Sequence, residues 1–439
     1  MQSYTLLDQP PLFPIGLSYV ATALANNEND FEIKTFDMNV HEKPFEALAD
    51  AVKSFQPDVV GISLRNIKVA KAGKHENCLE LHRNTVQTIR NNANNAKIIA
   101  GGTAFSLYAE TVMKDIPEID IGFFGEGEER FPQLLKTLND PSKIKGIYYR
   151  TSNGKVEFTG YPELLDFSKM PPPNREFFDI NLYKDNPICI GIISKKGCML
   201  NCEHCSDKYL SGSKLRQRNP KDVVDEIENL HKKHDIKYFF FTDHIFNIPP
   251  DHAKDICREI INRKLDIGWS GWFNEKEIDE ELLILCRDSG CYLVDCSPDG
   301  VDNRVLKGYR KTVTEEDLNR VADLCKKVRI RVTFSFMLNG PHDTFGTILK
   351  MLSFLIKTKI KLGKYFLLHS SCMVLLRIYP HSDLQKLAVE KGVIAPNDTL
   401  IEPRFYNQPP LKYLADFILF SINVLWNIKQ VVKKIVSNK

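Results

Sequence analysis

The sequence has almost no imbalance of charge and no block of like-charged residues. Its 439 residues include 59 lysines and arginines against 56 aspartates and glutamates, so the formal net charge is only +3. The charges are spread along the chain and form no basic stripe or tail, which gives no reason to expect a nucleic acid as partner. The length favours two domains of ordinary size, and a hydrophobic fraction of 43% is enough to give each a core.

Export signals and membrane-spanning runs are missing as well. Residues 1–11 lack the basic start, the apolar stretch and the cleavage site of a secreted protein, so we expect a cytoplasmic protein. The apolar stretch at residues 414–428 is interrupted by polar residues and is too short to span a bilayer. We expect a C-terminal helix over 411–439, which either packs on a hydrophobic patch or lies on a membrane surface.

Disulfide bonds are a further expected absence. In a reducing compartment the eleven cysteines should be free thiols or metal ligands. Six of them lie among apolar neighbours without a repeated ligand spacing, and we expect these to be core residues: Cys257, Cys286, Cys291, Cys296, Cys325 and Cys372.

Residues 1–138 alternate short apolar runs with helical stretches, which predicts repeated βα units around a parallel sheet. Strands are expected at Ser3–Leu7, Phe31–Asp37, Asp58–Ser63, Lys97–Ala100 and Ile119–Phe124, with helices at Gly16–Asn26, Phe45–Phe55 and Leu81–Asn92. This pattern is typical of an α/β, Rossmann-like, doubly wound domain, whose ligand lies over the carboxyl ends of the strands. Small and polar residues follow the expected strands, and they either converge on a ligand or serve only as turn formers.

A second α/β series follows a β-rich connector at 139–187, which has little periodicity and contains Pro171–Pro173. Residues 188–410 are expected to hold six βα units. The strands are expected at Ile188–Ser194, Tyr238–Thr242, Asp266–Gly271, Tyr292–Cys296, Arg331–Met337 and Phe366–Ile378. Six units are too few for a closed eight-stranded barrel and suit a partial, open one.

Three cysteines follow the first strand of this series, at a spacing of C-x3-C-x2-C: Cys198, Cys202 and Cys205. A zinc site would need a fourth ligand at a second paired spacing, and His204 is too close to its neighbours to complete a tetrahedron. Soft thiolates instead suit an iron–sulfur cluster, in which three ligands for four irons leave one iron open.

This segment resembles the radical S-adenosylmethionine (radical SAM) superfamily, whose hallmark is C-x3-C-x-aromatic-C in the same place, with His204 at the aromatic position. The resemblance implies a [4Fe-4S] cluster whose open iron binds S-adenosylmethionine, and His204 as a cofactor-binding residue. It also implies cleavage of the cofactor to a 5'-deoxyadenosyl radical that takes a hydrogen from the substrate.

The resemblance continues through the second domain. Residues 239–247 are similar to the second-strand segment of the subfamily with an N-terminal cobalamin domain, where an acidic residue such as Asp243 faces the barrel interior, and this implies a catalytic role for Asp243. Asp299 follows the fourth strand where the family usually has glutamate near the cofactor, and we expect it to bind the cofactor. Arg310 and Lys311 either reach an anion or are solvated.

The first domain resembles the cobalamin-binding domain that precedes such barrels, through Pro14–Leu17, Pro57–Ser63, Ala100–Thr103 and Gly125–Glu128. The implied cofactor-binding residues are Ser63, Leu64, Arg65, Asn66, Gly101, Gly102, Thr103, Gly125, Glu126 and Gly127. No D-x-H-x-x-G stretch offers a histidine to cobalt, so the lower face of the corrin should have another neighbour, of which Leu64, Arg65 and Asn66 are the nearest. The same absence fits a vestigial domain that binds no cobalamin.

With both cofactors, the resemblance implies a methyltransferase that acts on an unactivated carbon through the 5'-deoxyadenosyl radical and methylcobalamin. Two alternatives stay open: the same radical used for cyclisation, rearrangement or dehydrogenation, and a regulatory protein whose cluster senses redox state. The implied partners are a small-molecule, lipid or peptide substrate and a reducing electron donor such as flavodoxin or ferredoxin.

Overall fold

The computed structural model describes residues 1, 10–27, 31–66, 68–71, 74–184, 186–369, 372–422 and 424. The chain divides into two compact units. The first contains Met1–Gly197 and Asp207–Phe240, and the second contains Cys198–Ser206 and Phe241–Lys439. The three cysteines of the motif therefore belong to the second unit, and the predicted domain boundaries at 138, 187 and 410 stay predictions.

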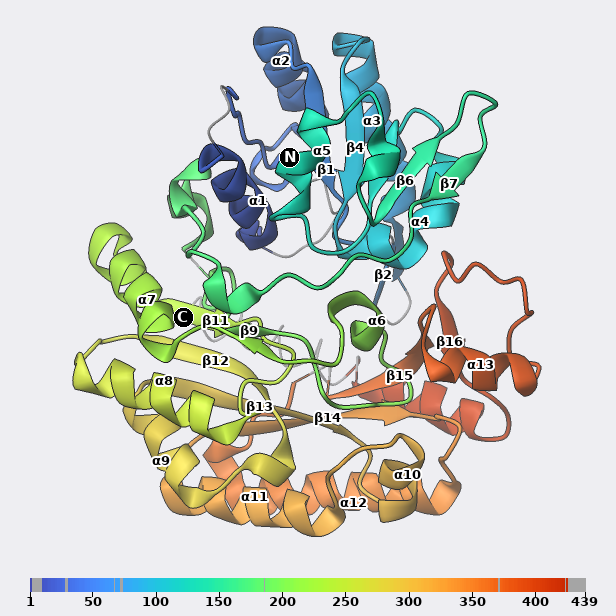
Figure 1. Cartoon of the computed structure of the whole chain (residues 1–439). Coiled ribbons are helices and arrows are strands. Elements are labelled where there is room, and N and C mark those ends of the chain that lie inside the picture. The colour runs from blue at the N-terminus through green and yellow to red at the C-terminus, as the bar shows by residue number, and fades with distance from the viewer. Residues whose placement is uncertain are drawn as a thin grey trace, which may run out of the picture. The chain divides into compact units, whose positions relative to one another are not determined.

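The first unit has a five-stranded sheet in the order β1-β4-β5-β6-β7 (Figure 1). The strands are β1 (Val59–Ser63), β4 (Lys97–Gly101), β5 (Ile121–Phe123), β6 (Ile147–Arg150) and β7 (Val156–Phe158). β1, β4 and β5 are parallel, and β6 and β7 are antiparallel to their neighbours. The helices are α1 (Ile15–Ala25), α2 (Pro44–Phe55), α3 (Cys78–Asn92), α4 (Thr103–Asp115) and α5 (Arg130–Lys136). The parallel strands with intervening helices confirm the predicted α/β class.

Two of the five strands expected in this sheet are not among those found. The strand predicted at Phe31–Asp37 is wrong, because the segment has no strand pairing beyond a single bridge at Asp37. The Asp37 carboxylate instead accepts a hydrogen bond from the backbone of Asn39 at 2.9 Å and caps a short 3-10 helix, Met38–Val40. The strand predicted at Ser3–Leu7 lies outside the described residues. β6 and β7 come from the segment expected to be a connector.

The second α/β series begins in the first unit with β8 (Gly191–Ile192) and α7 (Pro220–His234), and the chain passes to the second unit at the end of β11 (Tyr238–Phe241). In the second unit the strand order is β16-β15-β14-β13-β12. These strands are β12 (Gly268–Phe273), β13 (Cys291–Asp299), β14 (Val332–Leu338), β15 (Met373–Ile378) and β16 (Arg404–Tyr406). β12 to β15 are parallel and β16 is antiparallel. Because β16 ends this order, the sheet is open, as predicted for a partial barrel.

Four long helices of the second unit lie on one side of its strands (Figure 1). They are α8 (Pro250–Asn262), α9 (Glu280–Asp288), α11 (Glu315–Val328) and α12 (Phe345–Leu362). α11 and α12 begin at capping boxes with Thr314 and Thr344 as N-caps, which satisfy the first free backbone N–H groups. Two shorter helices, α10 (Asn303–Gly308) and α13 (Asp383–Glu390), were not expected.

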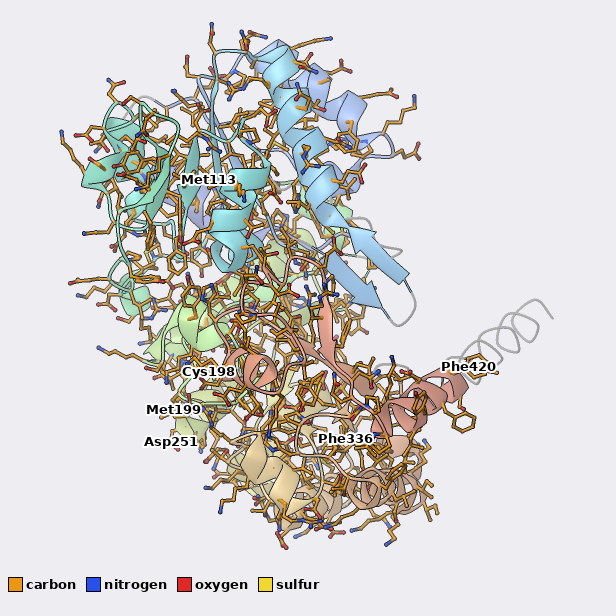
Figure 2. The ribbon with its side chains drawn as sticks, turned by 90° about the vertical axis from the view of Figure 1, so that its right-hand side faces the viewer. Met113, Cys198, Met199, Asp251, Phe336 and Phe420 are labelled. Atoms are coloured by element: carbon orange, nitrogen blue, oxygen red, sulfur yellow. The ribbon has the colours of Figure 1, made fainter. Side chains whose placement is uncertain are left out.

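The described start of the predicted C-terminal helix is helical over residues 411–422. Leu411, Ala415 and Ile418 are buried on one side, and Phe417 and Phe420 are about two-thirds exposed on the other. Figure 2 shows Phe420 pointing away from the rest of the second unit. In the described part of the chain, no helix is long and apolar enough to cross a membrane.

Candidate functional site

The three motif cysteines lie in the loop Cys198–Ser206 and differ from the other cysteines in their exposure to solvent. Cys198, Cys202 and Cys205 are partly exposed, and the remaining cysteines are buried, which confirms the core role predicted for six of them. Among the described residues, no three His, Cys, Asp or Glu side chains meet closely enough to hold a single metal ion. The donor set fits an iron–sulfur cluster, in which the three thiolates would each hold a different iron.

Glu203, between the second and third cysteines, fastens this loop to the rest of the second unit. Its backbone N–H donates to the Tyr309 carbonyl at 3.0 Å, and its carbonyl accepts from the Leu384 N–H at 2.9 Å. Its buried carboxylate lies 2.8 Å from Nε2 of His342. Nearby, the Ser206 hydroxyl donates to the Pro380 carbonyl at 2.7 Å. Segments that follow β13, β14 and β15 therefore all hold the cysteine loop.

The predicted cofactor residues His204 and Asp299 lie side by side. Nε2 of His204 is 3.4 Å from an oxygen of Asp299, which also pairs with Lys311. Burial opposes the charge on Lys311, but the negative charges of Asp299, Cys202 and Glu275 together outweigh burial and hold the pKa of the ammonium above its ordinary value. Lys311 also donates to the Ser297 carbonyl at 2.9 Å, and Arg310 pairs with Asp383. Both cations considered as anion ligands therefore have partners within the protein.

We expect His342→Ala to reduce the iron retained after reconstitution, because the buried Glu203 carboxylate would lose its side-chain partner, at a cost of about 1–3 kcal/mol. His342→Gln keeps an N–H donor and should retain most of the iron. The measurement is iron per chain, beside the thermal unfolding midpoint. Equal iron in both variants and the parent would contradict a positioning role for His342.

Asp243, predicted to be catalytic, is buried in the second unit just after β11 and is only 1% exposed. The sequence singled out Asp243 and the three cysteines, whose roles stay predictions, and it did not single out Glu203, Tyr309 or His342. No local signal marked them, because an acidic residue in a loop is ordinary and their contacts join distant segments of the chain.

At the carboxyl ends of β1, β4 and β5 the structure joins the loops predicted to meet cobalamin. The Leu64 N–H donates to the Gly101 carbonyl at 2.8 Å, and the Leu64 carbonyl accepts from Ala104 at 3.0 Å. Gly102 has φ +94°, and a Cβ there would lie 2.8 Å from the Leu64 carbonyl oxygen, so only glycine fits. The Gly125 N–H donates to the Ser106 hydroxyl at 2.9 Å. Ser63, Gly101, Gly102 and Gly125 are thus brought together.

The remaining predicted residues have different surroundings. Arg65 and Thr103 are exposed. The Asn66 carbonyl accepts a hydrogen bond from the His82 ring at 2.6 Å. Burial lowers the pKa of His82 to about 4, so the ring is neutral at pH 7. Glu126 accepts from Arg216 at 2.6 Å, inside a protein ion network. The edge therefore presents small side chains to a ligand, which suits close approach by a large nucleotide-bearing cofactor.

One acidic group of the second unit has no protein partner. Asp295, half-buried in β13, makes no hydrogen bond or ion pair with any described residue. Burial raises its pKa to about 6, and no cation opposes that shift. The groups that feel its charge are the thiols of Cys296 and Cys372. An unpaired carboxylate in this position costs stability, because desolvation is not compensated.

The stability of the protein is expected to fall between about pH 4 and pH 6 because of Asp295. In this range the folded chain keeps the proton that the unfolded chain has released, so raising the pH favours unfolding, by about 3 kcal/mol in total. Asp295→Asn should therefore be more stable than the parent at pH 7.5 and similar to it at pH 4. Urea midpoints at both pH values test this, with the exposed Asp266→Asn as control. A variant no more stable at pH 7.5 would contradict it.

Comparisons with known proteins support both the cobalamin-binding first domain and the cluster-binding second domain. A B12 binding domain model matches residues 9–135, and a Radical SAM superfamily model matches residues 192–355. An uncharacterized methyltransferase of Pyrococcus horikoshii is 26% identical over 358 residues, which are 80% of this chain and 75% of that protein. An anaerobic magnesium-protoporphyrin IX monomethyl ester cyclase of Rubrivivax gelatinosus is 26% identical over 316 residues, 69% of this chain and 55% of the cyclase.

Among solved structures, the radical S-adenosylmethionine methyltransferase TsrM of Kitasatospora setae, with cobalamin and a [4Fe-4S] cluster bound, has the same fold. The TM-score is 0.75 at 22% identity, covering 89% of this chain and 74% of TsrM. The cofactors that the two matched domains take are cobalamin, and a [4Fe-4S] cluster with S-adenosylmethionine. The chain is therefore an enzyme of the radical SAM superfamily, in the group whose radical SAM domain follows a B12-binding domain.

Proposed function

We propose that this enzyme is a cobalamin-dependent methyltransferase that places a methyl group on an unactivated carbon. The observation that carries the proposal is the pairing, in one chain, of a three-cysteine loop held at Glu203 with a loop edge of small residues in a B12-binding domain. The methyltransferase names of the Pyrococcus and Kitasatospora proteins support it. Carbon centres without an acidic proton cannot be methylated by deprotonation, so they need radical chemistry.

When bound, the cofactors supply one-electron cleavage of S-adenosylmethionine and a transferable methyl group. The residues of the chain bind and orient them. Cys198, Cys202 and Cys205 would each hold one iron, and the contacts of Glu203 fix the path of the backbone between them. His204 and Asp299 would lie beside the S-adenosylmethionine bound there. Asp243 stays our candidate for a catalytic group, because a buried carboxylate beyond β11 is suited to a polar contact with the reacting molecule.

The proposed substrate is a small molecule, with a lipid or a peptide as the alternatives. Cluster reduction needs an electron donor, for which a flavodoxin or a ferredoxin is proposed. Contact with a membrane surface through residues 411–422, where Tyr413, Phe417 and Phe420 are exposed, stays a prediction, as does a cytoplasmic location.

A second candidate function is radical chemistry without methyl transfer, such as cyclisation or rearrangement. The Rubrivivax relative, whose name describes a cyclase, favours it at the same 26% identity as the Pyrococcus methyltransferase. In this case the first unit would either hold cobalamin in another role or hold none.

One anaerobic experiment separates the two. The full chain is reconstituted with iron and sulfide, incubated with hydroxocobalamin, freed of excess and given S-adenosylmethionine and a reductant. Retained cobalamin together with both 5'-deoxyadenosine and S-adenosylhomocysteine supports the methyltransferase. Deoxyadenosine without S-adenosylhomocysteine supports the second candidate, and neither product refutes both.

A further inference from the structure

Three neighbouring strands of the second unit bring a tryptophan, an aspartate and a threonine into one row. Strand pairing sets Trp272 of β12 beside Asp295 of β13, and Asp295 beside Thr333 of β14. Paired residues of parallel strands point to the same face, about 4.8 Å apart. The row ends near Cys372, whose Sγ is 3.8 Å from the Thr333 hydroxyl.

The row is on the face of the sheet opposite the helices. Val294 and Cys296, on either side of Asp295, are fully buried, and the next strand buries Phe334, whose ring lies 5.4 Å from Phe354 of α12. Because successive side chains of a strand alternate between faces, Asp295 points away from that helix layer. The same alternation applies to Trp272, since its neighbour Phe273 is 1% exposed and Trp272 is 40% exposed.

Each member of the row has a property that packing alone does not explain. Trp272 leaves a large part of its ring accessible in the middle of a parallel sheet, where β12 otherwise buries Trp269 and Phe273. Asp295 keeps an uncompensated carboxylate, although an asparagine would fit in its place. Thr333, beside Asp295 in the row, is a fully buried polar residue whose hydroxyl has, among the described residues, only the Cys372 sulfur as a side-chain partner, at 3.8 Å. Residues retained at a cost to stability are a common mark of ligand-binding surfaces.

We propose that Trp272 and Asp295 bind the substrate of this enzyme, and that the substrate is an organic cation. A flat ring or apolar segment would lie on the Trp272 indole, and a protonated amine would pair with the Asp295 carboxylate. A carboxylate already withdrawn from water and without a cation among the described residues is a strong partner for an ammonium group. This assignment of a substrate class rests on the proposed function for the reaction that follows binding.

The recognised amine would be remote from the reacting carbon. Asp295 and Asp299 pair with Thr333 and Phe336, which are three residues apart on β14, so they lie roughly 10 Å apart along the sheet. Asp299 contacts His204 in the cysteine loop. Binding energy from a group so far from the chemistry is shared by ground state and transition state, so losing it raises KM and leaves kcat nearly unchanged.

The test uses the full chain, reconstituted with both cofactors, and two matched probes at pH 7.5. Tryptamine carries an indole ring and an amine, and indole-3-propionate carries the same ring and a carboxylate. Titration calorimetry of the parent is expected to give tryptamine an affinity at least about tenfold higher than indole-3-propionate. Asp295→Asn should remove this preference, and Trp272→Ala should weaken both probes alike. Asp266→Asn, an exposed carboxylate before β12, is the control and should match the parent.

Equal affinity of tryptamine for the parent and for Asp295→Asn would overturn the proposal, as would no measurable binding to the parent. The folded state of each variant is checked by circular dichroism and by the iron retained per chain after reconstitution, so that a loss of probe affinity is not mistaken for unfolding. Failure of the proposed methyl transfer would appear as missing S-adenosylhomocysteine and would leave the probe affinities unchanged, so the two failures are distinguishable.

Discussion

Cys202→Ala is expected to abolish cleavage of S-adenosylmethionine by the reconstituted enzyme. Three thiolates are the minimum set for a cluster with one open iron, and the sequence offers no fourth cysteine in the loop to replace a lost one. The variant should lose the visible absorption of the cluster and most of its iron, and its 5'-deoxyadenosine should fall to background. Cobalamin retention should persist, because its predicted ligating loops lie in the first unit.

The matched control is Cys78→Ala. This cysteine is fully buried in α3 of the first unit, so the variant removes a thiol without touching the motif. Its iron content and cleavage rate should equal those of the parent, with only a modest loss of stability from the small cavity. Full iron and activity in Cys202→Ala would refute the assignment of the cluster ligands, whatever the behaviour of the control.

The cysteine motif could be predicted from the sequence because all of its information is local. Three thiols within one loop, next to a predicted strand, are visible without knowledge of the fold. The contacts that hold this loop could not be predicted, because Glu203 meets His342 and Tyr309, which lie more than a hundred residues further along the chain. Only the meeting of strand ends at one edge of the sheet brings these residues together.

The difference between local information and contacts of distant segments also explains which parts of the predicted fold were right and which were wrong. Hydrophobic periodicity located α1, α2 and α3 to within a few residues, because each has a face with buried residues, but it gave no range for the 13-residue α4. The segment Phe31–Asp37 contains the apolar residues expected of a strand, but strand pairing also depends on the rest of the sheet. The Asp37 side chain caps the 3-10 helix that follows, so the chain turns there. The short α10 and α13 have too few residues to show a period.

For Asp295, the sequence shows an aspartate within a predicted strand but does not show what surrounds its side chain. An aspartate inside a predicted strand is an unfavourable choice for a sheet, yet nothing in the sequence says which face it occupies or whether a cation lies opposite. The register with Trp272 and Thr333 answers the first question, and the lack of any ion pair to Asp295 among the described residues answers the second.

A buried ion network in the first unit gives the largest expected effect on stability. Glu226 of α7 accepts from Arg175 at 2.5 Å and from Arg218 at 2.6 Å, and all three side chains are at most 4% exposed. Arg175 also donates to the Gly191 carbonyl at 2.7 Å, and Arg218 to the Ile193 carbonyl at 3.0 Å. The network therefore joins α7 to β8 and to the short helix that begins at Arg175.

Glu226→Gln is expected to destabilise the first unit by about 3–5 kcal/mol, because it leaves two buried guanidinium groups with no carboxylate between them. Glu228→Gln is the matched control. Glu228 lies two residues along the same helix and pairs with Lys232, whose side chain is 70% exposed. Its replacement should therefore cost much less, about 0.5 kcal/mol. Urea unfolding followed by the hydrogen exchange of β8 and α7 measures both variants within one unit, without assuming that the whole chain unfolds in a single step. If Glu226→Gln lowered the free energy of unfolding no more than Glu228→Gln, the ion network would not be what holds α7 to β8.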